Sequence, residues 1–154
     1  MEAKSIRLKT IKAVWDTLTI KEPLPDYLRA TRKITSSSDV YRLFRYLCHE
    51  TKEHFVTLHL DTKNKIVCVD QVSVGSLNAS VVHPREVLKT ALLSSAAAIV
   101  LIHNHPSGDP EPSCEDTLLT TRLKECCELL GIRCLDHVIV CSDEYVSFAD
   151  RGLI

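Results

Sequence analysis

The chain has 154 residues, a formal net charge of −1, and a composition that is 45% hydrophobic and 25% charged. That length suits one domain with a substantial core. The near-neutral charge gives no electrostatic reason to expect a nucleic-acid-binding protein, because duplex binding usually needs a concentrated basic face. One local cluster of basic residues occurs, which we interpret as solvated surface: Arg29, Arg32, Lys33, Arg42 and Arg45.

The seven cysteines do not show the C-x-x-C spacing of common metal sites. No apolar segment of the signal-peptide type follows Met1, and no segment approaches the length of a transmembrane helix. We therefore expect a cytoplasmic protein that does not associate with membranes. Its cysteines are expected to be free thiols, most of them packed in the core as small apolar residues.

Residues 1–34 give no clear secondary-structure signal. One set of apolar residues fits a helical face, whereas alternating apolar and basic residues near the start fit a strand equally well. The helical reading rests on Leu8, Ile11, Trp15 and Leu18. Pro23 and Pro25 then interrupt either pattern. We expect an N-terminal extension over residues 1–34, packed on a domain that spans residues 35–154.

The next part of the sequence predicts a helix and a pair of strands. The hydroxyls of residues 35–38 and the carboxylate of Asp39 indicate a helix start, because such groups satisfy free backbone N–H groups. From Glu53 the apolar period changes to two, which is typical of a strand. The expected elements are a helix over 35–50, a strand over 53–60, a turn at 61–64 and strand segments at 66–69 and 72–75. We expect a bulge or bend at Gly75.

The remaining sequence alternates between helices and strands. Pro84 suits the first position of a helix, and Gly131 is typical of a helix end. The expected elements are a helix from 83, a strand over 96–102, a helix over 113–130, and strands over 134–140 and 145–148. The second helix would bury Leu118, Leu119, Leu123, Cys126 or Cys127, and Leu130. This order predicts an α/β domain with both hairpin and crossover connections.

Two histidines follow the apolar strand, and they suggest a metal site. His103 and His105 are spaced i, i+2, so in extended chain they point to the same side, roughly 6–7 Å apart. After a turn rich in proline and glycine, Ser113-x-x-Asp116 begins the next helix. Two imidazoles and one carboxylate are the ligand set of an open zinc site, in which a fourth position is left for water. Such a site is suited to hydrolysis, provided that a general base and an oxyanion donor are present.

Each of these features also has a simpler interpretation. A single histidine is more often a hydrogen-bonded core or surface residue than a ligand, and Ser113-x-x-Asp116 alone resembles a capping box. Their combination at the carboxyl end of a buried strand favours the metal site, because α/β sheets place their functional sites there.

The spacing of these residues resembles the JAMM motif of JAB/MPN-domain metallopeptidases. The motif consists of His103-x-His105, seven residues that begin with proline, and Ser113-x-x-Asp116. The wider match resembles the RadC family within that superfamily and includes residues 83–86, 103–113, 136–137 and 145–152. The resemblance implies a three-layer α/β sandwich with a mixed sheet, similar to cytidine deaminases. It also implies one Zn²⁺ per chain, held by His103, His105 and Asp116.

The resemblance also implies roles for residues outside the ligand set. Glu53 occupies the position of the glutamate that acts as general base, and Ser113 that of the serine that stabilises the oxyanion. The residues alone do not favour Glu53 over Glu86 as the general base. Glu86 can also be interpreted as an acidic residue in the first turn of a helix, where the helix dipole favours a negative charge. Asp136 and His137 match the sequence pattern of the family, and we interpret them as a structural pair or as residues that support the ligands.

We therefore predict a zinc-dependent hydrolase of the metallopeptidase or isopeptidase type, acting on an unidentified peptide or protein. The alternative is a DNA-repair-associated protein that serves as a non-catalytic binding module. Long RadC members carry an upstream helix-hairpin-helix segment, which residues 1–34 do not resemble, and the charge gives no support to DNA binding. A metal-dependent nuclease is a third reading, although it would usually need two metals and several carboxylates.

Overall fold

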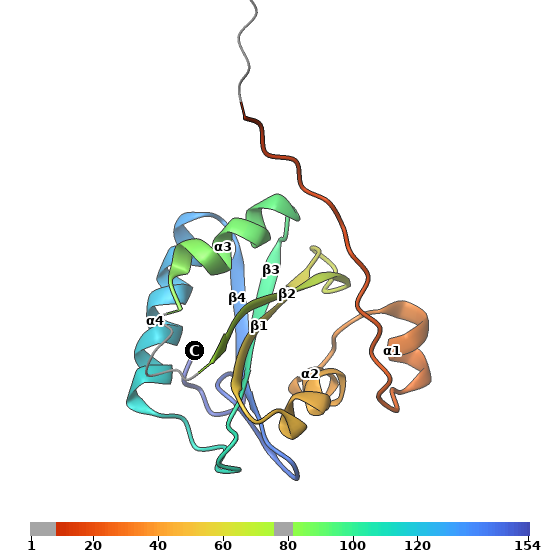
Figure 1. Ribbon diagram of the computed structural model, residues 1–154, viewed down its shortest axis with the longest axis vertical. Coiled ribbons are helices and arrows are strands. Elements are labelled where there is room, and N and C mark those ends of the chain that lie inside the picture. Colours follow the sequence, from red (N-terminus) through yellow and green to blue (C-terminus); the bar gives the residue numbers. More distant parts are fainter. Residues whose placement is uncertain (1–8, 76–81) are drawn as a thin grey trace, which may run out of the picture.

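The computed structural model describes residues 9–75 and 82–154, which form three layers with a five-stranded sheet in the middle (Figure 1). The strands are β1 (Glu53–Leu60), β2 (Ile66–Gly75), β3 (Ala98–Asn104), β4 (Arg133–Val140) and β5 (Tyr145–Ser147). The helices are α1 (Asp26–Thr31), α2 (Ser37–Phe44), the 3₁₀ helix η1 (Arg45–His49), α3 (Pro84–Leu93) and α4 (Cys114–Leu129). The predicted α/β sandwich with a mixed sheet is confirmed.

Different helices cover the two faces of the sheet (Figure 1). On one face, Phe44 of α2 and Leu47 of η1 are buried in an apolar cluster with side chains of β1, β3 and β4. On the other face, Val87 of α3 and Leu123 of α4 belong to a second cluster with β1 and β3. Strand β3 is therefore buried on both sides, which explains its nearly uninterrupted apolar sequence.

Because of the strand directions, the start of β1 and the end of β3 lie side by side at one end of the sheet. The strand order is β2-β1-β3-β4-β5, and β1 runs antiparallel to both β2 and β3. The start of β1 consequently meets the end of β3, and Phe55 pairs with His103. Strand β4 runs parallel to β3, so the crossover through α4 also begins at this edge. We call this end of the sheet, with residues 53–55, 103–105 and 113–116, the site edge.

Most of the predicted elements are confirmed, with changes in their limits. The helix predicted over 35–50 is divided into α2 and η1, β2 is one continuous strand, and β3 extends through Asn104. The bulge expected at Gly75 is wrong, because Gly75 pairs with Glu53 in regular register. The irregularities of this strand pair lie opposite Phe55–Val56 and opposite His59–Leu60 instead.

The predicted apolar face of α4 is partly wrong. Leu118 is 71% exposed, and Leu130, which follows the helix, is 46% exposed. The residues that α4 buries are Asp116, Thr120, Leu123 and Cys127. These positions share one helical face, and its first two residues are polar because the helix starts at the site edge. An apolar period therefore marks only the second half of the face.

Residues 9–25 do not form the helix considered from the sequence, and the strand considered near Ile6 and Leu8 lies outside the described residues. Ile11, Trp15 and Leu18 are exposed, and Leu8 lies outside the described residues. The extension contains one short helix, α1, which the sequence did not predict. Its Leu28 is buried in the same cluster as α2, so the last part of the extension is packed on the sandwich.

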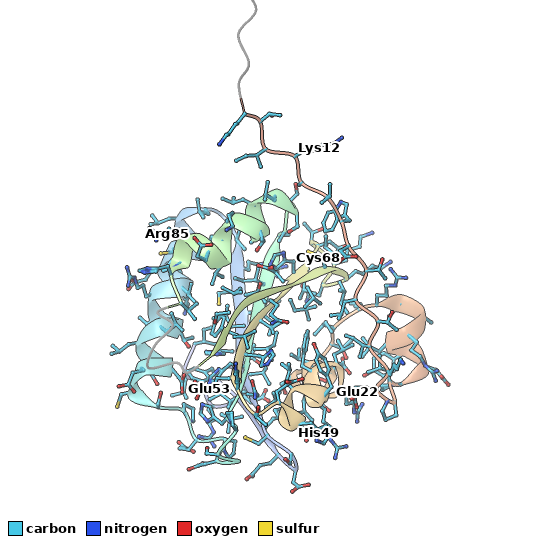
Figure 2. The ribbon with its side chains drawn as sticks, in the orientation of Figure 1. Lys12, Glu22, His49, Glu53, Cys68 and Arg85 are labelled. Atoms are coloured by element: carbon cyan, nitrogen blue, oxygen red, sulfur yellow. The ribbon has the colours of Figure 1, made fainter. Side chains whose placement is uncertain are left out.

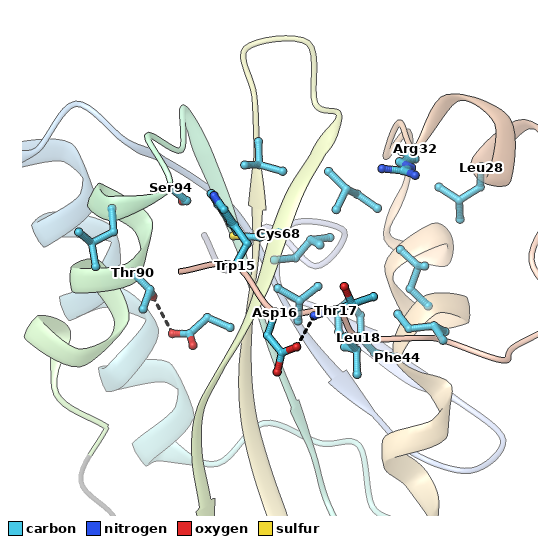
Figure 3. A pocket seen from close by; sticks show the side chains of 18 of the residues that line it. Trp15, Asp16, Thr17, Leu18, Leu28, Arg32, Phe44, Cys68, Thr90 and Ser94 are labelled. Atoms are coloured by element: carbon cyan, nitrogen blue, oxygen red, sulfur yellow. Dashed lines mark hydrogen bonds between the residues drawn. The ribbon is translucent and has the colours of Figure 1, made fainter. Parts of the chain in front are cut away.

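The N-terminal segment and strand β2 together line a cavity of about 900 Å³. Trp15 and Cys68 line it together with Leu18 and Phe44 (Figure 3). Its lining residues include none from the site edge. This cavity is therefore separate from the predicted metal site.

Surface features agree with most of the composition-based expectations. The five basic residues of the cluster between Arg29 and Arg45 are all exposed. All seven cysteines are free thiols, as predicted. Only Cys127 and Cys141 are buried and Cys114 is exposed, so the prediction that most cysteines pack in the core is wrong. Within the described residues, no helix has the length and apolar character needed to cross a membrane.

Candidate metal centre

Two elements bring the three predicted ligands together. His103 is the second-last residue of β3, His105 follows the end of that strand, and Asp116 lies in the first turn of α4. The Nε2 atoms of the two histidines are 2.9 Å apart. Asp116 Oδ1 lies 3.3 Å from His103 Nε2, and Asp116 Oδ2 lies 3.5 Å from His105 Nε2. These three side chains form a group that could hold a metal ion.

The spacing of the ligand atoms fits a small divalent ion. In a tetrahedral site with zinc–nitrogen and zinc–oxygen distances near 2.0–2.1 Å, any two ligand atoms lie about 3.3 Å apart. The three separations of 2.9, 3.3 and 3.5 Å lie on both sides of that value. The arrangement needs only small adjustments to surround such an ion.

Hydrogen-bond chemistry gives an independent test of the fit. His105 Nδ1 lies 2.7 Å from the backbone carbonyl of Asp109, which can only accept a hydrogen bond. Nδ1 must therefore carry a proton, so in the neutral ring Nε2 presents its lone pair to the Asp116 carboxylate, itself an acceptor. Two facing acceptors repel one another unless a cation or a proton lies between them. The donor set is thus arranged for a positive charge at its centre.

The electrostatics of the group follow from burial and from the single carboxylate. Burial lowers the pKa of His103, and the neighbouring Asp116 and Glu53 charges offset this only in part. For the half-buried His105, hydrogen bonding to Asp116 raises the pKa. Burial acts to raise the pKa of Asp116, but the hydrogen bonds with His103, His105 and Ser113 outweigh it and hold that pKa far below its ordinary value. Asp116 therefore carries a negative charge at neutral pH.

Ser113 begins α4 in a complete capping box. Its hydroxyl accepts a hydrogen bond from the Asp116 backbone N–H at 3.1 Å and donates to Asp116 Oδ2 at 2.7 Å. The Ser113 backbone N–H donates to the same Oδ2 at 2.8 Å. Ser113 is an exposed residue, and its hydroxyl proton is directed to Asp116, one of the candidate ligands. The second hydrogen bond would still hold Asp116 if that hydroxyl turned away.

Glu53 is the first residue of β1 and lies at the site edge (Figure 2). It pairs with Gly75 of β2 and is half-buried. After the larger effect of burial and the contribution of Asp116, its negative charge also acts to raise the pKa of His103. It acts in the same direction on His105, after hydrogen bonding to Asp116. By contrast, Glu86 is exposed in the first turn of α3 and pairs with Lys89 at 2.6 Å.

Three polar residues near the candidate ligands were not predicted from the sequence to belong to the site, or were given no definite role in it. Asn104, Thr120 and His137 are all buried. Thr120 lies one helical turn after Asp116 on the buried face of α4. His137 of β4 pairs with Leu101 of β3 and contacts His103. The sequence signal for Thr120 is its position four residues, about one helical turn, after the candidate ligand Asp116.

Comparisons with known proteins agree with this architecture. The family profile described as "RadC-like JAB domain" matches residues 34–153. The UPF0758 protein of Methanosarcina mazei is 53% identical over 124 residues, covering 80% of this chain and 54% of its own length. The UPF0758 protein of Pelobacter propionicus is 51% identical over 123 residues, covering 79% of this chain and 54% of its own length. The chain thus spans about half the length of the curated relatives it matches.

Proposed function

Because this chain belongs to the RadC-like JAB domain family, we propose that it is a zinc-dependent hydrolase that cleaves an amide or isopeptide bond in a peptide or protein. His103, His105 and Asp116 would hold one zinc ion. Zinc in a site with three protein ligands acts as a Lewis acid and lowers the pKa of a bound water to about 7. The ligands come from the end of β3 and the start of α4, which leaves the outer side of the site edge for a substrate.

Glu53 would move the proton in this reaction. Its carboxylate lies at the same edge as both histidines and is only half-buried, so a substrate and a water can reach it. Acting as general base, it would take a proton from the attacking water and then give that proton to the leaving amine. Glu86 does not fit this role, because it is on α3 and its carboxylate already pairs with Lys89.

Ser113 would stabilise the negative charge that develops on the substrate carbonyl oxygen. For this the hydroxyl must turn from Asp116 Oδ2 toward the substrate. The backbone N–H of Ser113 also donates to Oδ2, at 2.8 Å, so Asp116 keeps a hydrogen bond when the hydroxyl leaves. A single donor of this kind typically contributes about 10²–10³-fold to turnover.

One observation carries the proposal. With His105 neutral and its proton on Nδ1, two hydrogen-bond acceptors face each other, His105 Nε2 and the Asp116 carboxylate, at a separation suited to zinc. Either a proton or a metal cation would satisfy this arrangement, and a zinc ion held by these three ligands would keep a coordination position open. This supports catalytic rather than purely structural use of the metal.

The test combines metal analysis with a cleavage screen on a library of peptides and isopeptide-linked peptides. We expect the purified wild type to contain one zinc per chain and to cleave part of the library. Glu53→Gln should keep its zinc and lose about 10²–10⁴-fold in turnover. The matched control Glu86→Gln should keep both. Full activity of Glu53→Gln would disprove the role of that residue, and a wild type without zinc would disprove the whole proposal.

The alternative is a non-catalytic binding module that uses the same fold. It predicts that the wild type binds zinc but cleaves nothing in the library. It further predicts that Asp116→Ala, which removes a ligand, leaves the cellular phenotype unchanged. A change of phenotype in Asp116→Ala together with cleavage by the wild type supports the hydrolase.

A further inference from the structure

A chain of three hydrogen bonds runs from the candidate ligand His103 into the protein interior. His103 Nδ1 lies 2.8 Å from His137 Nε2, and His137 Nδ1 lies 2.6 Å from Thr120 Oγ1. Thr120 Oγ1 lies 2.6 Å from the backbone carbonyl oxygen of Asp116. The side chains in this chain are buried, with exposed fractions of 0% for both histidines and 2% for Thr120. Solvent therefore does not compete for these hydrogen bonds.

The final carbonyl sets the direction of every hydrogen bond in the chain. The Asp116 carbonyl oxygen can only accept, so the single hydroxyl proton of Thr120 is donated to it. Thr120 Oγ1 must then accept from His137 Nδ1, which leaves the lone pair of His137 on Nε2. That lone pair accepts the proton of His103 Nδ1. By elimination, the lone pair of His103 is on Nε2, the atom that faces Asp116 and His105.

The surrounding residues hold the His137 ring in place. Its ring stacks on Phe148 with centroids 4.8 Å apart, and it meets Phe55 edge-on at 5.7 Å. Its backbone N–H donates to Asp136 Oδ1 at 2.7 Å, and Asp136 also accepts from the Ser147 hydroxyl at 2.6 Å. The ring nitrogens of His137 are both occupied by His103 and Thr120. His137 is thus oriented by packing and is not itself available as a fourth ligand.

The geometry points to Thr120 and His137 as positioning residues that fix the metal-binding tautomer of His103. This inference rests on the proposed zinc site and assigns two residues that set its affinity without touching the ion. When the ring nitrogen that does not bind the metal donates to a fixed acceptor, the other nitrogen presents its lone pair to the metal. The histidine then needs no change of tautomer or ring orientation on binding. Removing Thr120 Oγ1 leaves His137 free to adopt either tautomer, and one of these two states places a proton on Nε2 of His103, the nitrogen that would bind the metal.

Zinc affinity, measured by competition with a chromogenic chelator, is the first readout. We expect Thr120→Val, which has nearly the same shape but no hydroxyl, to bind zinc about 10- to 100-fold more weakly than the wild type. The control Thr120→Ser keeps the hydroxyl and should bind within a few-fold of the wild type. His137→Leu should weaken binding at least as much, and His137→Gln, whose amide can accept from His103 and donate to Thr120, should recover part of the loss.

Nitrogen-15 NMR of the histidine rings is the second readout, and it does not depend on metal affinity or activity. In the metal-free and zinc-loaded wild type, His103 and His137 should both be protonated at Nδ1, while Thr120→Val should show a mixture. Equal zinc affinity of Thr120→Val and Thr120→Ser, or a wild-type His103 protonated only at Nε2, would overturn the inference. Either result leaves the hydrolase proposal intact, whereas absence of cleavage by a zinc-loaded wild type disproves that proposal and leaves this inference standing.

Discussion

The side-chain carboxamide of Asn104 accepts a hydrogen bond from the backbone N–H of His54 at 2.7 Å. The same carboxamide donates to the backbone carbonyl of Lys52 at 3.0 Å, so it joins the chain on both sides of Glu53. Asn104 is fully buried at the end of β3, and in the sequence it lies between the two candidate ligand histidines. One side chain therefore connects the position of the proposed base to the strand that carries the ligands.

This connection predicts a specific effect of Asn104→Asp. The carboxylate has the same shape but cannot donate to the Lys52 carbonyl, so the start of β1 loses one of its two anchors. We expect turnover to fall roughly 10- to 100-fold, because small displacements of a catalytic group are costly. Zinc content should remain one per chain, and steady-state kinetics should show the loss in kcat rather than in KM.

A thermal melting curve shows whether the Asn104→Asp variant is still folded. Loss of the hydrogen bond that the buried Asn104 side chain donates to the Lys52 carbonyl should cost about 1–3 kcal/mol of stability, which a folded protein of this size tolerates. A folded Asn104→Asp protein with unchanged kcat would show that Asn104 does not position Glu53.

Substitution of Ser113 separates its two roles. Ser113→Ala removes both the helix cap and the proposed oxyanion donor, whereas Ser113→Thr keeps a hydroxyl suited to both. Loss of the cap alone should cost about 1 kcal/mol of stability. Loss of the donor should reduce kcat by about 10²–10³-fold. If Ser113→Ala melts at a lower temperature but keeps the kcat of Ser113→Thr, Ser113 is only a helix cap.

The sequence could indicate the candidate ligand group because its three residues belong to two local patterns joined by one turn. His103 and His105 are separated by a single residue, and Asp116 follows a recognisable helix start. The supporting residues are different. His137 reaches His103 only through the parallel pairing of β3 with β4, and such pairing leaves no local mark in the sequence.

The errors in the predicted elements have a similar physical cause. The apolar pattern of α4 suggested Leu118 as a buried residue, but the helix turns Asp116 and Thr120 inward, and its first turn lies beside His103 and His105. Residues 9–25 carry apolar side chains without burying Ile11, Trp15 or Leu18, so their periodicity could not be read as secondary structure. Local patterns predict elements well where packing on the core decides them, and less well where a polar site or an edge does.

Removal of the metal should abolish activity without unfolding the chain. The core has apolar clusters on both faces of the sheet, and these clusters include none of the three candidate ligands. We expect treatment with a chelator to leave the far-ultraviolet circular dichroism spectrum unchanged and to lower the melting temperature, because zinc binds only the native state. Readdition of zinc should restore both activity and melting temperature. A chain that unfolds on chelation would instead indicate a structural metal.

The junction between α1 and the sandwich should depend on pH through Asp39. This buried carboxylate accepts hydrogen bonds from the Thr35 backbone N–H at 2.9 Å, from the Thr35 hydroxyl at 2.7 Å and from the Tyr27 hydroxyl. Burial acts to raise the pKa of Asp39, but these hydrogen bonds outweigh it, and the pKa is lower than its ordinary value. A carboxylate with a lowered pKa stabilises the folded state at any pH above the unfolded value of about 3.9, and this contribution is lost as the pH falls through the folded value.

Urea unfolding of Asp39→Asn and of the wild type tests this expectation. At pH 7 the variant should be less stable by about 1–3 kcal/mol, because an amide replaces a charged acceptor of several hydrogen bonds. The difference should shrink below about pH 3.9, where the wild-type carboxylate also begins to lose its charge. Asp26→Asn is the matched control, since the Asp26 side chain is 98% exposed and its ion pair with Arg29 should contribute little. A stability difference that is the same at pH 7 and in acid would show that the charge of Asp39 does not hold α1 to α2.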